Sequence, residues 1–187
     1  MKEPKKILAI SGSTRQNSTN LNLINAIVEL FSDKLDIRIF EGLSDIPHFN
    51  PDLDRDNPPE KVSEFRRQLK DADGILICTP EYAMGVPGTL KNAIDWTVSS
   101  MEFSHKPVAL ITASTVGEKG HYSLMNTLKV IGADIPYSSQ LLISYVKTKL
   151  RDGRIIDPYT VKQVKKIIDS LISIMAKQYK TVNKRML

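Results

Sequence analysis

Residues 6–20 read KILAISGSTRQNSTN, and they join an apolar run to a polar loop. The run Lys6–Ile10 is short and continuous, as is typical of a parallel strand covered on both faces. After the loop, apolar residues recur at helical spacing from Leu21 to Phe31, with candidate N-caps directly before them. The order strand, polar loop, helix predicts the first unit of an α/β fold.

The loop from Ser11 to Asn20 has the composition of an anion site. Hydroxyl and amide side chains dominate it, Arg15 supplies a guanidinium, and Gly12 permits a positive φ. The free N–H groups at the start of the following helix favour a bound anion. The loop lacks the Gly-Lys-Ser/Thr ending of a Walker A motif and the three glycines of a dinucleotide fingerprint. It therefore predicts a site for one terminal phosphate, with an ordinary capped helix as the alternative.

The rest of the chain alternates between the same two patterns. Further strands are predicted over residues 37–40, 74–79, 107–113 and 140–143, and further helices over residues 62–72, 87–98, 121–131 and 161–175. Five strands alternating with five helices predict one α/β domain, 1–187, with a doubly wound parallel sheet and helices on both faces. Ligands bind such sheets at the carboxyl ends of the strands, so the candidate site comprises three loops. They are residues 11–20, 80–87 and 114–120.

Composition and charge exclude several classes of function. The chain has 187 residues, a formal net charge of +5 and one cysteine, Cys78, inside an apolar run. A lone buried cysteine and the absence of a signal peptide or long apolar stretch favour a cytoplasmic protein with no membrane partner. The basic residues are scattered and no nucleic-acid motif accompanies them, so we expect no nucleic-acid partner. No group of Cys, His or acidic residues has ligand spacing, so we expect no metal site.

The second candidate loop resembles a family signature. Residues 79–96 read TPEYAMGVPGTLKNAIDW, which resembles the signature of the NAD(P)H-dependent FMN reductase family, Pro-Glu-Tyr-Asn followed by Pro-Gly-x-Leu-Lys-Asn-Ala-Ile-Asp-Trp. Ser11 to Arg15, with Ser18 and Asn20, resembles the phosphate loop of that family, and residues 49–53 resemble its connecting segment. The resemblance runs from about residue 5 to about residue 142.

The resemblance implies a flavodoxin-like sheet of order 2-1-3-4-5 and noncovalently bound FMN. Carried over by position, the residues that contact the phosphate are Ser13, Arg15, Ser18, Thr19 and Asn20. Those that line the flavin ring are Pro80, Glu81, Tyr82, Ala83 and Met84. Ser114 and Gly117 close the far side. The family often has Asn-His-Ser or Asn-Gly-Ser where this chain has Ala83-Met84-Gly85, a departure that bears on the choice of substrate.

The activity implied by the resemblance is a ping-pong oxidoreduction. NAD(P)H is the co-substrate, and hydride passes through FMN to a small-molecule acceptor, which is a quinone, azo compound, nitro compound or flavin. No side chain is predicted to be catalytic. A non-enzymatic electron carrier and a flavin-dependent regulatory module are the alternatives, although such carriers are typically acidic and this chain is basic.

The resemblance also implies a homodimer or homotetramer. The long connection Glu41–Pro59 has no clear period, and loops of that length are usually functional or packed as partner surfaces. Trp96 is predicted to lie in the core or at a subunit contact. We expect the connection and Trp96 to help form the subunit interface beside the flavin.

Overall fold

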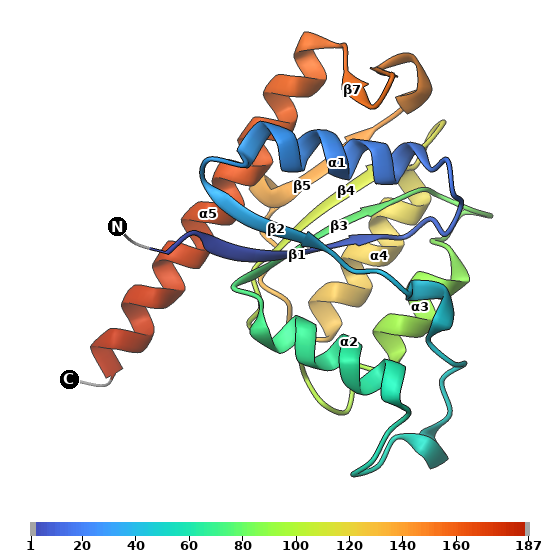
Figure 1. Cartoon of the computed structure of the whole chain (residues 1–187), viewed down its shortest axis with the longest axis vertical. Coiled ribbons are helices and arrows are strands. Elements are labelled where there is room, and N and C mark those ends of the chain that lie inside the picture. The colour runs from blue at the N-terminus through green and yellow to red at the C-terminus, as the bar shows by residue number, and fades with distance from the viewer. Residues whose placement is uncertain (1–2, 186–187) are drawn as a thin grey trace.

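Five parallel strands form the central sheet of the computed structural model, which describes residues 3–185 and the side chains of residues 3–178. The strands are β1 (Lys5–Ser11), β2 (Leu35–Ile39), β3 (Gly74–Thr79), β4 (Val108–Ala113) and β5 (Gln140–Ile143). They pair in the order β2-β1-β3-β4-β5, all in parallel (Figure 1). This is the flavodoxin-like order that the sequence predicts, so the predicted fold is confirmed.

The helices form a layer on each face of the sheet. They are α1 (Thr19–Phe31), α2 (Glu60–Asp71), α3 (Gly88–Asp95), α4 (Glu118–Val130) and α5 (Pro158–Arg185). Side chains alternate between faces along a strand. Leu8, Ile10 and their neighbours therefore pack under α2, α3 and α4, whereas Ile7, Ala9 and their neighbours pack under α1 and α5. Both faces are apolar, which explains why the strands read as continuous apolar runs.

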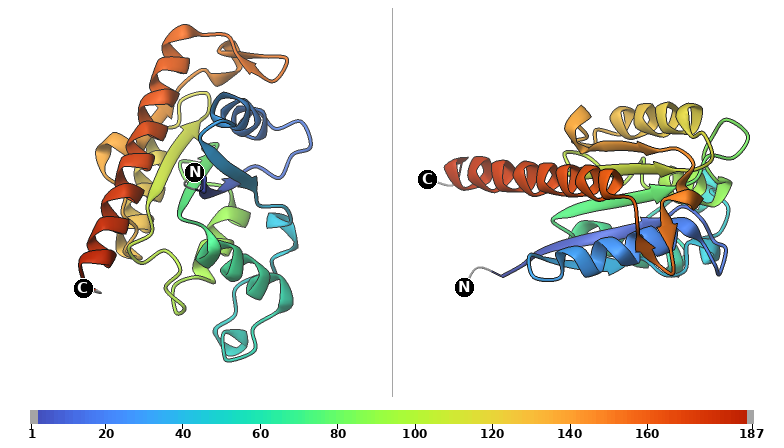
Figure 2. Two further views of the ribbon diagram at one scale, coloured as in Figure 1. Left: turned by 60° about the vertical axis from the view of Figure 1, so that its left-hand side comes forward. Right: turned by 90° about the horizontal axis from the view of Figure 1, so that it is seen from above.

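The two ends of the sheet differ in what they carry. The start of β1 and the C-terminal end of α5 lie at one end, and the loops that follow the carboxyl ends of the strands lie at the other (Figures 1 and 2). The candidate loops therefore gather at one edge of the sheet. No helix within residues 3–185 has both the length and the apolar character that crossing a membrane requires.

Several boundaries differ from the prediction. Helix α4 begins at Glu118, three residues early, because Gly117 is its N-cap with φ +99°. Helix α3 ends at Asp95, and Val98 lies in the turns that follow. A hairpin of two short strands, β6 (Leu150–Arg151) and β7 (Arg154–Ile155), was not predicted from the sequence. Its turn residues Asp152 and Gly153 both have positive φ, as a type I′ turn requires.

The connection 41–59 packs on its own chain, and Trp96 belongs to that contact. Trp96 is 0% exposed, and its Nε1–H donates to the carbonyl of Pro47 at 2.8 Å. The ring of Phe49 meets it edge-on with centroids 5.1 Å apart. The side chain of Trp96 thus lies in the core of the chain, and the expectation that it helps form a subunit interface is wrong.

Candidate functional site

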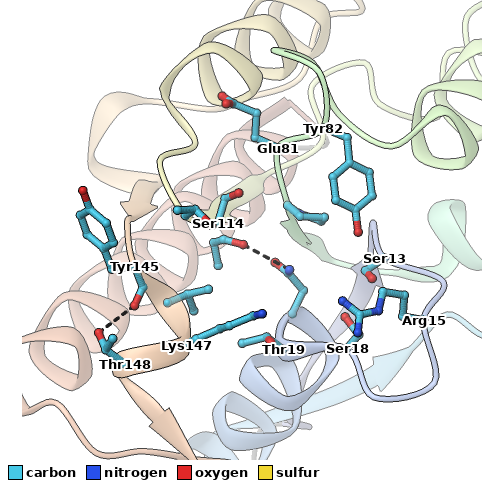
Figure 3. A pocket seen from close by; sticks show the side chains of 15 residues that line it. Ser13, Arg15, Ser18, Thr19, Glu81, Tyr82, Ser114, Tyr145, Lys147 and Thr148 are labelled. Carbon is cyan, nitrogen blue, oxygen red and sulfur yellow. Dashed lines mark hydrogen bonds between the residues drawn. The ribbon is translucent and has the colours of Figure 1, made fainter.

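A cavity of about 400 Å³ lies at the carboxyl ends of the strands (Figure 3). Its volume is in the range of small-molecule binding sites. The loops after β1, β3 and β4 line it together, as predicted, and the segment after β5 lines it too. The lining residues are Ser13, Arg15, Ser18, Thr19, Asn20, Pro80, Glu81, Tyr82, Ala113, Ser114, Thr115, Tyr145, Val146, Lys147 and Thr148.

The loop between β1 and α1 presents a helix N-terminus to this cavity. Ser18 is the N-cap of α1, and its hydroxyl oxygen accepts the N–H of Leu21 at 3.3 Å. Ser11 Oγ donates to the carbonyl of Ser13 at 3.0 Å, which steadies the start of the loop. Arg15 is exposed and lines the cavity. The helix dipole, hydroxyl groups and a guanidinium in one place are the donor set that a phosphate requires.

Gly12 is required at the start of this loop by a close approach and not by its φ. Its N–H donates to the carbonyl of Cys78 at 2.8 Å. A Cβ atom at this position would stand 2.3 Å from Thr79 Oγ1, which is closer than any real contact. Gly12 is not among the residues with positive φ, so that part of the sequence interpretation is wrong. The glycine instead lets the phosphate loop lie directly against the end of β3.

Asn20 ties three of these segments together. Its side chain is buried, its Nδ2 donates to the carbonyl of Ala113 at 3.2 Å, and its Oδ1 accepts the thiol of Cys78 at 3.2 Å. Burial raises the pKa of the Cys78 thiol, so the thiol remains protonated and able to donate. The amide of Asn20 is thus engaged within the protein at both ends, although the residue borders the cavity.

The loop after β3 forms the wall above the phosphate loop. Tyr82 is 49% exposed at the edge of the cavity. The carboxylate of Glu81 points away from the cavity (Figure 3), and its Oε2 accepts the N–H of Gly120 at 2.6 Å. This bond joins the loop after β3 to the first turn of α4. The carboxylate of Glu81 is therefore engaged by α4, although the residue lines the cavity.

Ala83 and Met84 form a tight turn beside the cavity. Tyr82 and Gly85 exchange both backbone hydrogen bonds at 2.9 Å, and the two residues between them have φ of 49° and 62°. A type I′ turn needs positive φ at both positions, and it favours Asn and Gly there. Ala83, Met84 and Gly117 are not among the residues that line the cavity, so their contact with a flavin stays a prediction.

The segment Tyr145–Thr148 forms a fourth wall of the cavity that was not predicted from the sequence. It follows β5, and the N–H groups of Tyr145 and Val146 donate to the carbonyls of Thr115 and Ser114 at 3.0 and 3.2 Å. The rule that ligands bind at the carboxyl ends of parallel strands applies to β5 as much as to the other strands. Applying it there would have identified this wall and its cation, Lys147.

A flavodoxin-like sheet with a phosphate-type loop and a cavity at its switch point defines an α/β protein of the nucleotide- and flavin-binding class. The sequence model of the family described as NADPH-dependent FMN reductase matches residues 5–148. The chain therefore belongs to the NADPH-dependent FMN reductase family. It is an oxidoreductase that uses FMN as cofactor and NAD(P)H as co-substrate.

Individual relatives span almost the whole chain. An NAD(P)H-dependent FMN reductase of Pseudomonas aeruginosa is 34% identical over 164 residues, 84% of this chain and 88% of the relative. A 2-hydroxy-1,4-benzoquinone reductase of a Burkholderia species is 33% identical over 172 residues, 88% of this chain and 92% of the relative. The structure of FerB, a flavoenzyme NAD(P)H:(acceptor) oxidoreductase from Paracoccus denitrificans, matches with a TM-score of 0.76 and 27% identity. This structural match covers 92% of this chain and 98% of FerB.

Proposed function

We propose that the chain transfers reducing equivalents from NAD(P)H, by way of bound FMN, to a small-molecule acceptor, first of all a quinone. The observation that carries the proposal is that the phosphate-type loop and the loops after β3 and β4 line one cavity. Relatives named quinone reductase support the choice of acceptor, among them one from Escherichia coli that is 28% identical over 169 residues, 86% of this chain and 90% of the relative. Azo compounds, nitro compounds and free flavins are the other acceptors we propose.

The residues that line the cavity fit FMN in two groups. Ser13, Arg15, Ser18 and Thr19 surround the N-terminus of α1 and suit the phosphate. Asn20 stays a proposed phosphate contact through its backbone N–H, because its side chain is bonded to Ala113 and Cys78 and positions the loop. Pro80 to Tyr82 and Ser114 suit the flavin ring, with Tyr82 as an aromatic wall. For Ala83 and Met84 we propose a backbone contact at the edge of the flavin ring, and for Gly117 a place on the far side of the flavin. Both rest on the family resemblance alone.

FMN supplies the two-electron chemistry when it is bound, so the side chains have to bind, orient and exclude water. Backbone N–H groups beside the ring would stabilise the charge of its reduced form. One open cavity serves the nicotinamide and the acceptor in turn, which gives ping-pong kinetics.

An absorption spectrum of the purified protein, followed by NAD(P)H consumption with a quinone, tests the proposal. We expect flavin bands, or their appearance on adding FMN, and turnover whose double-reciprocal plots are parallel. Bound FMN that NAD(P)H does not reduce would instead indicate an electron carrier. Bound FMN that NAD(P)H reduces, but that none of the tested acceptors reoxidises, would indicate a regulatory module. A colourless protein that takes up no FMN would overturn the proposal.

We also propose a cytoplasmic homodimer or homotetramer whose neighbouring subunit borders the flavin. Apolar side chains near the cavity mouth support this, since Tyr82, Met84 and Tyr145 are 49%, 74% and 64% exposed. The connection 41–59 remains a candidate for the interface because Phe49 and Leu53 are 38% and 49% exposed. Light scattering at micromolar concentration should give a multiple of 21.0 kDa, and a monomeric mass would contradict the assembly.

A further inference from the structure

We infer that Lys147 is a second cation of the phosphate site, acting across the cavity from Arg15. The inference rests on the proposed function, because the phosphate is that of FMN. Lys147 comes from the segment after β5, which lies outside the three loops that the sequence predicts. The phosphate would then be held from two walls of the cavity, one on each side of the N-terminus of α1.

The backbone that carries Lys147 is firmly held. The short helix η4 (Val146–Thr148) is fixed at its start by the bonds from Tyr145 and Val146 to the loop after β4. Thr148 Oγ1 donates back to the carbonyl of Tyr145 at 2.8 Å, and the side chain of Val146 is buried. The following hairpin packs on the α1 and α5 face through Leu150 and Ile155. A side chain on so fixed a turn is presented to a ligand with little rearrangement.

The side chain of Lys147 is directed into the cavity. Figure 3 shows its amine reaching from η4 toward the side from which Thr19 and the phosphate loop approach. Within the part of the chain whose side chains are described, neither Lys147 nor Arg15 makes an ion pair, whereas Lys91 and Arg66 are paired with Asp95 and Asp54. Two cations of the cavity are thus available to an anion.

The acidic residue that lines this cavity does not compete for these charges. Among the described residues that line the cavity, Glu81 alone is acidic. Its carboxylate points away from the cavity and accepts the N–H of Gly120. Among the described residues that line this cavity, the positive charges beside α1 therefore have no carboxylate directed at them, and Glu41, which lines the adjoining hollow with Arg15, makes no ion pair with it.

The charge of a phosphate monoester leaves room for a second cation. At neutral pH the group carries a charge of about −1.5 to −2. Arg15 supplies one positive charge and the N-terminus of α1 about half a charge. Together they leave a dianion undercompensated by about half a charge in a partly enclosed cavity. Lys147 supplies the missing charge.

The experiment compares FMN with riboflavin, which lacks the phosphate, in flavin titrations of the apoprotein at fixed ionic strength. We expect Lys147→Ala to weaken FMN binding about tenfold, as for one charge-assisted hydrogen bond, and to leave riboflavin binding unchanged. Lys147→Arg should retain most of the FMN affinity. Lys149→Ala is the matched control, since Lys149 is two residues further along and does not line the cavity. It should change neither affinity.

Three results would overturn the inference alone, while the wild-type protein still binds FMN. They are an unchanged FMN affinity in Lys147→Ala, an equal loss for riboflavin, which would place Lys147 at the ring or in the fold, and an equal loss in Lys149→Ala, which would indicate a general field. A wild-type protein that binds no FMN would overturn the proposed function, and this inference with it.

Discussion

The loop that begins the cavity and the turn that flanks it are made in opposite ways. The loop 11–20 is held by side-chain hydrogen bonds: Ser18 caps α1, and Asn20 joins Ala113 and Cys78. The turn Tyr82–Gly85 is held by its two backbone bonds, and it keeps two residues other than glycine in the left-handed region. The loop 11–20 has buried polar groups in a fixed geometry, whereas the turn Tyr82–Gly85 has a strained backbone at an exposed position.

Under the proposed function, this difference would separate the binding of the cofactor from the admission of substrates. A phosphate site gains from donors that are already in place, because their ordering costs nothing when the ligand arrives. Strain of the kind found at Ala83 and Met84 costs stability and gathers at functional sites. The comparison therefore predicts that changes in the loop are costly and that relief of the strained turn is favourable.

Removal of the Arg15 guanidinium should have the largest effect on binding. We expect Arg15→Ala to weaken FMN binding by about 1.5 to 3 kcal/mol, since a hydrogen bond to a charged group is lost. The control is Arg38→Ala, because Arg38 is exposed on β2, pairs with Asp36 and lies outside the cavity. A flavin titration in which both variants bind like the wild type would show that the loop does not hold the phosphate.

Loss of the Asn20 amide should destabilise the fold itself. Asn20→Ala leaves the carbonyl of Ala113 and the thiol of Cys78 without this buried partner, which we expect to cost about 1 to 3 kcal/mol of unfolding free energy. Asn22→Ala, an exposed position in the same helix, should stay within about 0.5 kcal/mol. Urea unfolding measures both variants, and equal midpoints would refute the anchoring role of Asn20.

The bond between Cys78 and Asn20 can be isolated by a double-mutant cycle. If the thiol donates to Asn20 as found, Cys78→Ala and Asn20→Ala should be non-additive by about 0.5 to 1 kcal/mol. The unfolding free energies of the wild type, both single variants and the double variant give this coupling. Strict additivity would mean that Asn20 steadies the loop through Ala113 alone.

The sequence was sufficient for the elements with strong local patterns. Five apolar runs predicted the strands of the sheet, and the rule for parallel sheets brought the loops after β1, β3 and β4 to one edge. The hairpin after β5 was missed because strands as short as Leu150–Arg151 have no readable period. Its signal was the Asp152-Gly153 pair, a common hairpin turn.

Tertiary contacts account for the other differences. The reason for Gly12 is the nearness of Thr79, which is 67 positions away in the sequence and brought close by the pairing of β1 with β3. The role of Asn20 depends in the same way on Cys78 and Ala113. Local composition identifies an anion loop, but it does not reveal which of its side chains are engaged elsewhere in the protein.

Relief of the strained turn should give the smallest effect, and the most informative one. A residue other than glycine in the left-handed region costs about 1 to 2 kcal/mol of stability, which a substitution to glycine removes. The greater freedom of glycine in the unfolded chain opposes this gain by about 0.4 to 1 kcal/mol. We therefore expect Met84→Gly to raise the unfolding free energy by about 0.5 kcal/mol.

Met101 is the matched control, because it is also an exposed methionine with φ of 62° and does not line the cavity. Met101→Gly should stabilise the protein to a similar degree and leave both FMN affinity and turnover unchanged. If Met84→Gly gives the same gain with the same flavin binding, its strain is only tolerated. If Met84→Gly weakens FMN binding or lowers turnover while Met101→Gly does not, the strained turn belongs to the site. That result would support the proposed contact of Met84 with the flavin and would end the division between a binding loop and a separate flanking turn.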